Sequence, residues 1–159
     1  MSIIIESYLR KEDGEFLPIQ SWIDPIPDHD YLEGALKLII NGTPIMTLTM
    51  WDYIDELWAY IINALQKFTL DDSVHIYFPD QPIKLDMKRT PPNMILVSIS
   101  SRSGKFDNSA WTHEGNFVHQ LLDAGEKFFT KMNKLDPTGQ GQYENDIERI
   151  EEVRRSFSR

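Results

Sequence analysis

Short apolar stretches separated by polar turns make up the beginning of the chain. The β-branched run Ile3–Ile5 predicts a strand over residues 2–9, and alternating apolar positions predict another over 31–40. Asn41-Gly42 then precedes a further apolar run, and both residues tolerate the positive φ of a tight turn, so we predict a hairpin there. Between the first two strands, residues 16–30 contain three prolines and are expected to form an ordered extended loop.

Three longer segments have the three-to-four-residue apolar spacing of amphipathic helices: residues 50–68, 112–135 and 142–157. We expect Thr49 to cap the first helix. Asp52, Asp55 and Glu56 then fall in its first two turns, where the helix dipole favours acidic side chains. Gly125 lies on the apolar stripe of the second helix, which indicates a close approach to the sheet.

Strands return between the first two helices. Residues 74–78 and 83–88 alternate, so each predicts a strand with one buried face and one wet face. Residues 94–99 are almost continuously apolar and predict a central strand covered on both faces, while the polar stretch 100–111 is expected to be a loop. This order predicts an α+β fold: an antiparallel or mixed sheet of about six strands, two main helices packed on it and a C-terminal amphipathic helix.

A length of 159 residues fits one domain with a real core. We expect a single α+β domain over residues 1–136, followed by a linker and the C-terminal helix over 137–159. That helix is predicted to dock through Ile147, Ile150 and Val153, either on its own domain or on a second copy in a homodimer.

Composition narrows the possible chemistry. The chain has no cysteine, which excludes disulfides, thiolate metal sites and cysteine nucleophiles and fits a reducing compartment. The N-terminus lacks the basic region and long apolar run of a signal peptide, and no stretch has the roughly 20 apolar residues of a membrane helix. We therefore expect a cytoplasmic protein.

Two groups of polar residues resemble metal sites only superficially. His113 and His119 are six residues apart, which places them about 240° apart around a helix and not on one face. Asp28-His29-Asp30 puts two carboxylates on one side of an extended segment, but a hard cation needs about six oxygen ligands and a solvated loop is the preferred interpretation. The sequence assigns no catalytic residue, no metal site and no cofactor.

Charge divides the chain into two halves. Residues 1–72 carry 13 Asp and Glu against 4 Lys and Arg, whereas residues 73–159 carry 12 of each, so the formal charge of −9 belongs to the first half. An acidic face repels nucleic acid and anionic membranes and attracts basic proteins, although net charge can also serve solubility alone. The candidate partner-binding residues are Trp22, Asp24, Asp28, Asp30, Glu33, Asp52, Asp55 and Glu56.

These candidate residues carry two further expectations. Asp28, Asp30, Asp52 and Asp55 are expected to be exposed to solvent, since they lie in a loop or near a helix start. Trp22 lies in the proline-rich loop and has two interpretations: it can anchor an interface, or it can cover nearby apolar surface and fasten the loop.

The segment Trp51–Tyr60, with the sequence WDYIDELWAY, resembles the acidic-aromatic helix of small uncharacterised bacterial proteins of the toxin-immunity type. This resemblance covers about a tenth of the chain. It implies a small, acidic, cytoplasmic and non-enzymatic α+β protein that binds a basic toxin domain and blocks its active site. No site residue of that family transfers to this chain, because no matching motif occurs elsewhere in it.

Three functional hypotheses follow. The first is a cytoplasmic binding protein, in its most concrete form an immunity-type inhibitor, that presents an acidic face to a basic protein partner. The second is a small hydrolase whose site is assembled in space from His113, His119, Asp123 and a serine. The third is a structural homo-oligomer formed through the C-terminal helix.

Overall fold

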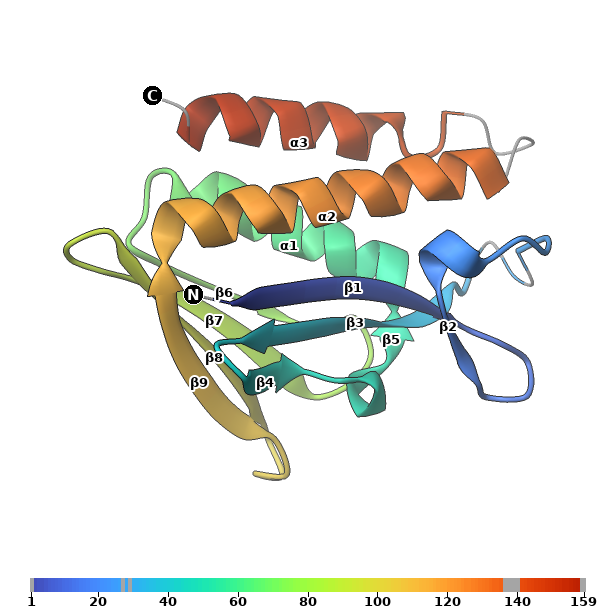
Figure 1. Ribbon diagram of the computed structural model, residues 1–159, viewed down its shortest axis with the longest axis horizontal. Helices are drawn as coiled ribbons and strands as arrows, with labels where there is room; N and C mark the ends of the chain where they lie inside the picture. The colour runs from blue at the N-terminus through green and yellow to red at the C-terminus, as the bar shows by residue number, and fades with distance from the viewer. Residues whose placement is uncertain (1, 27, 29, 136–140, 158–159) are drawn as a thin grey trace.

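A computed structural model describes residues 2–26, 28, 30–135 and 141–157. Within these residues two antiparallel sheets are covered by two long helices, and a third helix lies on those two as the outermost layer (Figure 1). The predicted α+β class is confirmed. The single predicted sheet is wrong in detail, because the strands divide between two sheets.

The first sheet is built from the N-terminal part of the chain. It contains β1 (Ile3–Arg10), β2 (Phe16–Pro18), β3 (Glu33–Ile40), β4 (Thr43–Met46) and β5 (Asp52–Tyr53). The strand order is β2-β1-β3-β4, and β5 pairs with the beginning of β3. The predicted hairpin between β3 and β4 is confirmed: Asn41 and Gly42 both have positive φ, at 50° and 82°.

The second sheet is an antiparallel meander in chain order. Its strands are β6 (Ser73–Tyr77), β7 (Ile83–Thr90), β8 (Met94–Ser101) and β9 (Asp107–His113). The prediction of a loop over 100–111 was wrong, since β9 pairs with β8 over seven residues. Its outer face is exposed and, apart from Trp111, polar, and within β9 Ala110 and Thr112 alone are buried, so the apolar pattern of a strand is missing.

The prediction that residues 94–99 are covered on both faces was also wrong. Strand β8 is central, between β7 and β9, but buried and half-buried residues alternate along it. Ile95, Val97 and Ile99 face the core, whereas Leu96 and Ser98 lie on the less covered side. The continuous apolar run therefore reflects a partly covered outer face and not a second layer.

Side-chain amides join the two sheets where β4 meets β9. The Asn41 Nδ2 group donates a hydrogen bond of 3.1 Å to the Trp111 carbonyl, and Asn108 Nδ2 donates one of 3.0 Å to the Pro44 carbonyl. The residues joined by these bonds are 70 and 64 positions apart in the sequence, respectively. They link the two sheets directly where β4 contacts β9.

Helix α1 (Ile54–Phe68) begins later than predicted. The 3₁₀ turn Leu48–Met50 and the short strand β5 occupy the stretch that was expected to be helical, and Thr49 does not cap the helix. The reason is strand pairing: Asp52 and Tyr53 pair with the beginning of β3, so the backbone stays extended until Ile54.

Helix α2 (Glu114–Leu135) crosses α1 at a close approach. A Cβ built on Gly125 would lie 3.2 Å from the Trp58 ring on α1. The close approach at Gly125 is therefore to a helix, and the predicted close approach to the sheet was wrong. Trp58 is completely buried beneath it, and its Nε1–H donates a hydrogen bond of 3.0 Å to Ser7 Oγ on β1. This pair ties both helices to the first sheet.

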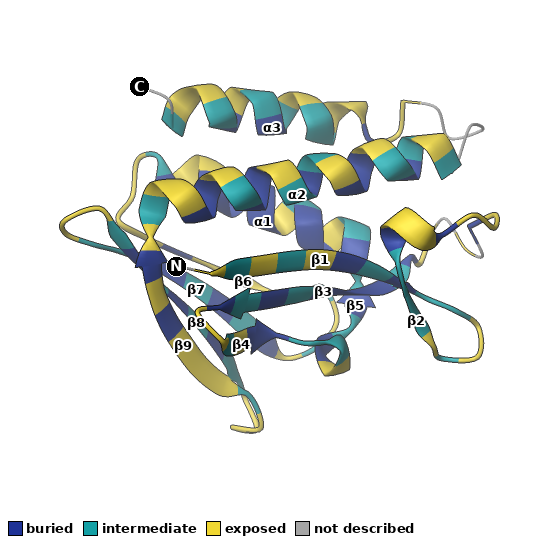
Figure 2. Ribbon diagram, in the orientation of Figure 1, coloured by how far each residue is buried: buried dark blue, intermediate teal, exposed yellow. Residues whose placement is uncertain are grey.

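Helix α3 (Glu144–Phe157) packs on α1 and α2 (Figure 2). Ile150 and Val153 are buried in this contact and Ile147 is half-buried, as predicted for docking on the same chain. Arg154 strengthens it, donating to Asp123 and Glu126 of α2 at 2.9 and 3.2 Å. The linker predicted before this helix falls largely on residues 136–140, which lie outside the described part of the chain.

Candidate partner-binding surface

The structure brings two acidic segments together at one end of the first sheet. The β1–β2 turn and the loop that leads from β2 to β3 jointly line two shallow depressions. Five acidic residues line them: Glu12, Asp13, Asp24, Asp28 and Glu33. We call these residues, together with the exposed Asp30, the acidic loop surface. Glu12 and Asp13 were not among the predicted binding residues, because their place beside the loop depends on the pairing of β1 with β2.

The basic residues of this region are held by neighbouring side chains. Arg10 forms an ion pair of 3.2 Å with Glu33 and stacks over the Trp51 ring at 4.5 Å, and Lys11 lies 3.7 Å from Glu15. Residues 10–33 contain seven acidic and two basic residues. The acidic loop surface therefore carries a clear negative excess after these pairs are counted.

Trp22 does not lie on the surface as an anchor. It is only 4 % exposed, and its Nε1–H donates a hydrogen bond of 2.8 Å to the Asp24 carbonyl. This contact fastens the loop over the core, which is the second of the two interpretations of this residue. Two large apolar side chains of the described part of the loop are exposed instead: Ile23, at 86 %, and Tyr31, at 60 %.

Asp52 was expected to be exposed and is instead buried, at 2 % exposure. Its carboxylate accepts hydrogen bonds from the backbone N–H groups of Tyr53, Asp80 and Gln81 at 2.7 to 3.1 Å. Asp80 and Gln81 belong to the turn between β6 and β7, so Asp52 fastens the second sheet to the first. This residue has a structural role and does not belong to the exposed acidic face.

Asp55 also lies away from the acidic loop surface. It is half-buried beneath α3, and Tyr143 Oη donates to its carboxylate at 3.1 Å. Burial raises the pKa of Asp55, and the hydrogen bond from Tyr143 partly opposes that change. Glu56 is exposed, and the pKa of its carboxyl is raised first by partial burial and then by the neighbouring Asp55 and Asp52 charges. The start of α1 thus contributes one exposed acid.

In the described part of the chain, no hydrogen bond or ion pair links His113, His119 and Asp123, the named residues of the alternative hydrolase site. His113 ends β9 and His119 lies on α2, both exposed. The Asp123 carboxylate is bound to Arg154 of α3 at 2.9 Å. Among the described residues no three His, Asp or Glu side chains could share a metal ion. His29 of the Asp28-His29-Asp30 group lies outside the described residues.

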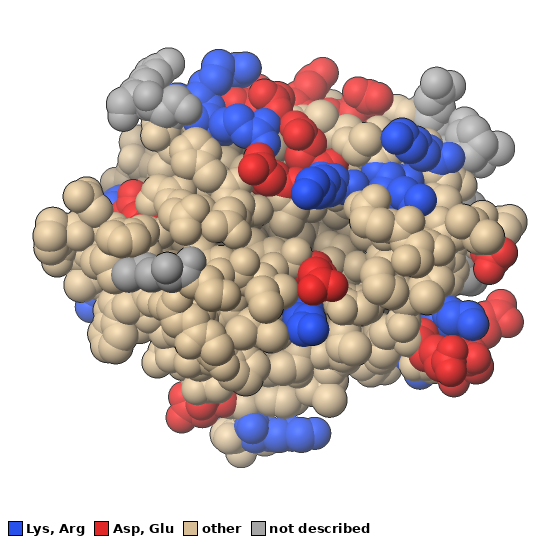
Figure 3. Space-filling model, in the orientation of Figure 1, with Lys and Arg blue, Asp and Glu red and all other residues tan. Residues whose placement is uncertain are grey.

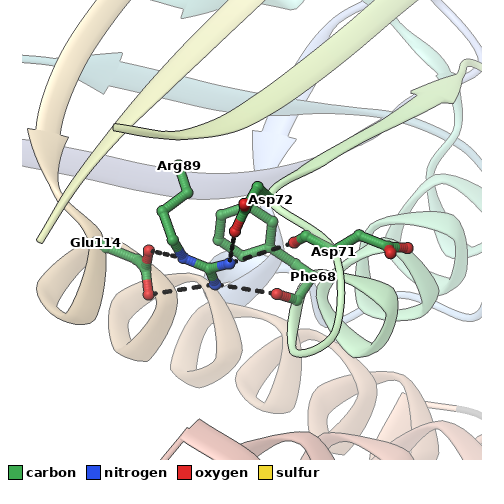
Figure 4. Close-up of polar contacts among 5 residues, drawn as sticks. All are labelled: Phe68, Asp71, Asp72, Arg89 and Glu114. Carbon is green, nitrogen blue, oxygen red and sulfur yellow. Dashed lines mark hydrogen bonds and ion pairs between the residues drawn. The ribbon is translucent and has the colours of Figure 1, made fainter. Parts of the chain in front are cut away.

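Arg89 makes the densest set of polar contacts and has to be considered as an anion site (Figure 4). Its Nε donates to Glu114 at 2.6 Å, and its two terminal nitrogens donate to Asp72, Glu114 and the carbonyls of Phe68 and Asp71. These bonds use all five donors of a guanidinium group, and the group also stacks 4.2 Å above the Phe68 ring.

No donor of Arg89 is left for a ligand. Burial lowers the pKa of the guanidinium, but the bonds to Glu114 and Asp72 outweigh it and raise that pKa. Arg89 therefore joins the end of α1, strand β7 and the start of α2 into a structural clamp (Figure 4).

Comparison with known proteins found no matching family model, curated protein or solved structure. Among the described residues no helix is both long enough and apolar enough to span a membrane.

Proposed function

We propose that this chain is a non-enzymatic binding protein that presents the acidic loop surface to a basic protein partner. One observation carries the proposal. Ile23 and Tyr31 project into solvent from a loop whose other exposed side chains include Asp24, Asp28 and Asp30. Exposed apolar and aromatic side chains within a charged rim are typical of protein interfaces, where a few such residues contribute most of the binding energy.

The contacts beneath the loop support this proposal. Trp22 is buried and bonded to the Asp24 carbonyl, so the loop is held in place before a partner arrives. Tyr31 also contacts the Tyr53 ring, with 5.6 Å between ring centroids. A surface that is already ordered loses less conformational entropy on binding than a mobile one does. Ile23 and Tyr31 would then supply apolar contact, while the acids steer the approach of a basic partner.

An immunity-type inhibitor is the concrete form of this proposal. The segment Trp51–Tyr60 resembles such proteins in sequence, although in this chain it includes strand β5 as well as the first turns of α1. In that role the acidic loop surface would cover the basic active site of a toxin domain in the cytoplasm. Inhibition would be steric and would need no chemistry from this chain.

The direct test is a comparative pull-down from the source cell. The test variant is the triple substitution Glu12→Lys, Asp24→Lys and Asp30→Lys, in which three exposed side chains of the acidic loop surface change sign. The matched control, Asp107→Lys, Glu148→Lys and Glu152→Lys, makes the same charge change at exposed positions on β9 and α3. Both triples are expected to keep the wild-type melting temperature within about 2 °C, since exposed substitutions have small effects.

The proposal predicts that wild type and control retain the same basic protein and that the test variant loses it. Retention should also weaken as salt rises, because the screening length falls from about 30 Å at 0.01 M to about 8 Å at 0.15 M. If all three proteins retain the same partners, charge in this loop serves solubility and the proposal is wrong.

A further inference from the structure

A second surface lies on the same sheet, between strand β1 and helix α2. It is a groove of about 510 Å³. One side consists of five consecutive residues of β1, Ile3–Ser7. The other is formed by five residues of α2: Gln120, Asp123, Ala124, Lys127 and Phe128. Pro18–Gln20 close one end. Figure 3, in the orientation of Figure 1, shows the surface hollowed near the centre of this face, where β1 and α2 lie.

The β1 side of the groove is an unpaired strand edge. Strand β3 pairs with β1 along one edge from Ile3 to Leu9. On the other edge β2 pairs only with Tyr8–Arg10. In the part of the chain that the structure describes, no strand therefore pairs with Ile3–Ser7 on the groove side.

The register shows which backbone groups face the groove. The Ser2 carbonyl accepts a hydrogen bond of 2.7 Å from Asn41 N–H, so Ser2 points its backbone groups toward β3. The backbone N–H and C=O groups of successive residues point to opposite edges of a strand. Those of Ile4 and Glu6 therefore bond to β3, while those of Ile3 and Ile5 point toward the groove. The pairing with β2 agrees with this register. By the same alternation Tyr8 bonds to β3, so its neighbour on β2 needs no N–H group for pairing, and that neighbour is Pro18, which has none.

We propose that this groove binds an extended peptide segment of another protein, which adds to β1 as a further strand. Unpaired N–H and C=O groups on a sheet edge recognise the backbone of an extended chain. Five residues of edge correspond to about 17 Å of extended peptide. Side chains of the added strand that point toward α2 would meet the Ala124 and Phe128 positions, so apolar residues belong at those places.

Charge defines one end of the peptide. A second depression, lined by Gln20, Glu126, Lys127, Thr130, Lys131 and Lys134, shares Gln20 and Lys127 with the groove and therefore adjoins it. The acids Glu126 and, in the groove, Asp123 are both paired with Arg154, which leaves the lysines as the excess charge here. The three lysines are spaced four and three residues apart on α2 and so lie on one face of the helix. The segment that fits is apolar along the strand edge and acidic where it passes these lysines. A second copy of this chain fits less well, because its own β1 edge is overhung by its own α2.

The probe is a phage-displayed library of random linear eight-residue peptides, selected on the immobilised full-length protein. An enriched peptide is then synthesised and its Kd measured. Ala124→Arg, which fills the groove, should weaken binding at least tenfold, and Lys127→Glu should weaken it by about three- to tenfold. The matched controls lie outside the groove: Gly115→Arg, where a Cβ would meet open space, and Lys88→Glu on β7. Both should leave the Kd within about twofold.

Strand addition has a property that an ordinary apolar groove lacks. N-methylation of the peptide at every second amide should weaken binding roughly tenfold per site, whereas methylation of the amides between them should have little effect. Three results would overturn the proposal: no enriched peptide, a Kd unchanged by Ala124→Arg, or equal sensitivity at all amides. A dimer that becomes monomeric in Ala124→Arg would overturn it too, since a second copy would then occupy the groove.

This site is independent of the acidic loop surface. The triple variant Glu12→Lys, Asp24→Lys and Asp30→Lys should keep the wild-type Kd for the peptide, and Ala124→Arg should keep the partner of the acidic loop. A result that contradicts the peptide groove therefore leaves the proposal for the acidic loop surface unaffected, and the reverse also holds.

Discussion

The two sheets treat their edges differently. In the second sheet β7 and β8 have strands on both sides, while the edge strands β6 and β9 contact α1 and β4 respectively. In the first sheet, within the described part of the chain, the β1 edge that faces away from β3 is unpaired over Ile3–Ser7, and the loop after β2 carries exposed acids. Protected edges favour stability, whereas open edges and projecting loops are where proteins meet partners. The second sheet therefore has mainly a structural part in the fold, whereas both surfaces that we propose for binding lie on the N-terminal sheet and its loops.

The largest effect is expected where the two long helices pack on the first sheet. Trp58→Ala should lower the free energy of unfolding by about 3–5 kcal/mol, because it removes a completely buried ring and leaves the Ser7 hydroxyl without its donor. Urea denaturation measures this change. An unchanged midpoint would mean that Trp58 does not join helices and sheet as described.

The Arg89 clamp is the next most sensitive point. Arg89→Ala should cost about 2–4 kcal/mol, since it leaves the half-buried Glu114 carboxylate without its partner and removes five hydrogen bonds. Arg102→Ala is the control, because Arg102 is exposed in the β8–β9 turn. If both variants unfold at the same urea concentration, the clamp does not stabilise the meander.

A comparison of Asp52 with Asp30 tests whether a buried acid stabilises the fold and an exposed acid does not. Asp52→Asn should cost about 1–3 kcal/mol, because a neutral amide is a weaker acceptor for the backbone N–H groups of the β6–β7 turn. Asp30→Asn, at an exposed position in the acidic loop surface, should change stability by less than about 0.5 kcal/mol. Thermal melts of the two variants side by side give the answer. Equal losses would show that Asp30 is structural as well.

The smallest effect is a pH dependence at the contact between α1 and α3. Burial raises the pKa of Asp55 above its unfolded value, so the charged form is disfavoured in the folded protein. Stability from this group is therefore present at low pH and is lost as pH rises through the raised pKa. Asp55→Asn keeps an acceptor for Tyr143 and removes the charge. It should be more stable than wild type at pH 7 and should lose that advantage toward about pH 4.

Urea midpoints of both proteins between pH 4 and 7 measure this difference. An Asp55→Asn variant that is less stable than wild type at pH 7 would show that the carboxylate charge is favourable in the folded state.

Apolar periodicity predicted the long elements well, because the helices bury one continuous stripe each. It failed at β9, where most side chains are exposed and the strand exists through its pairing with β8. It also failed at Asp52, where pairing with β3 keeps the backbone extended and moves the acid into the interior. Both errors arise from contacts between distant segments, which local spacing does not contain.

The candidate surface was predicted in part. The loop acids Asp24, Asp28 and Asp30 are exposed as expected from their turn-rich, proline-rich context. Glu12 and Asp13 join them only because β1 and β2 form a hairpin. The open edge of β1 could not be predicted at all, since it depends on β2 being only three residues long.

Amide hydrogen exchange, followed residue by residue by NMR, tests the difference between the two sheets most directly. The account predicts an alternating pattern along β1, with Ile4 and Glu6 protected by β3 and Ile5 exchanging much faster at the open edge. It predicts no alternation from Ile95 to Ile99, where β8 is bonded on both sides. Protection of Ile5 equal to that of Ile4 and Glu6 would contradict the open edge and the comparison built on it.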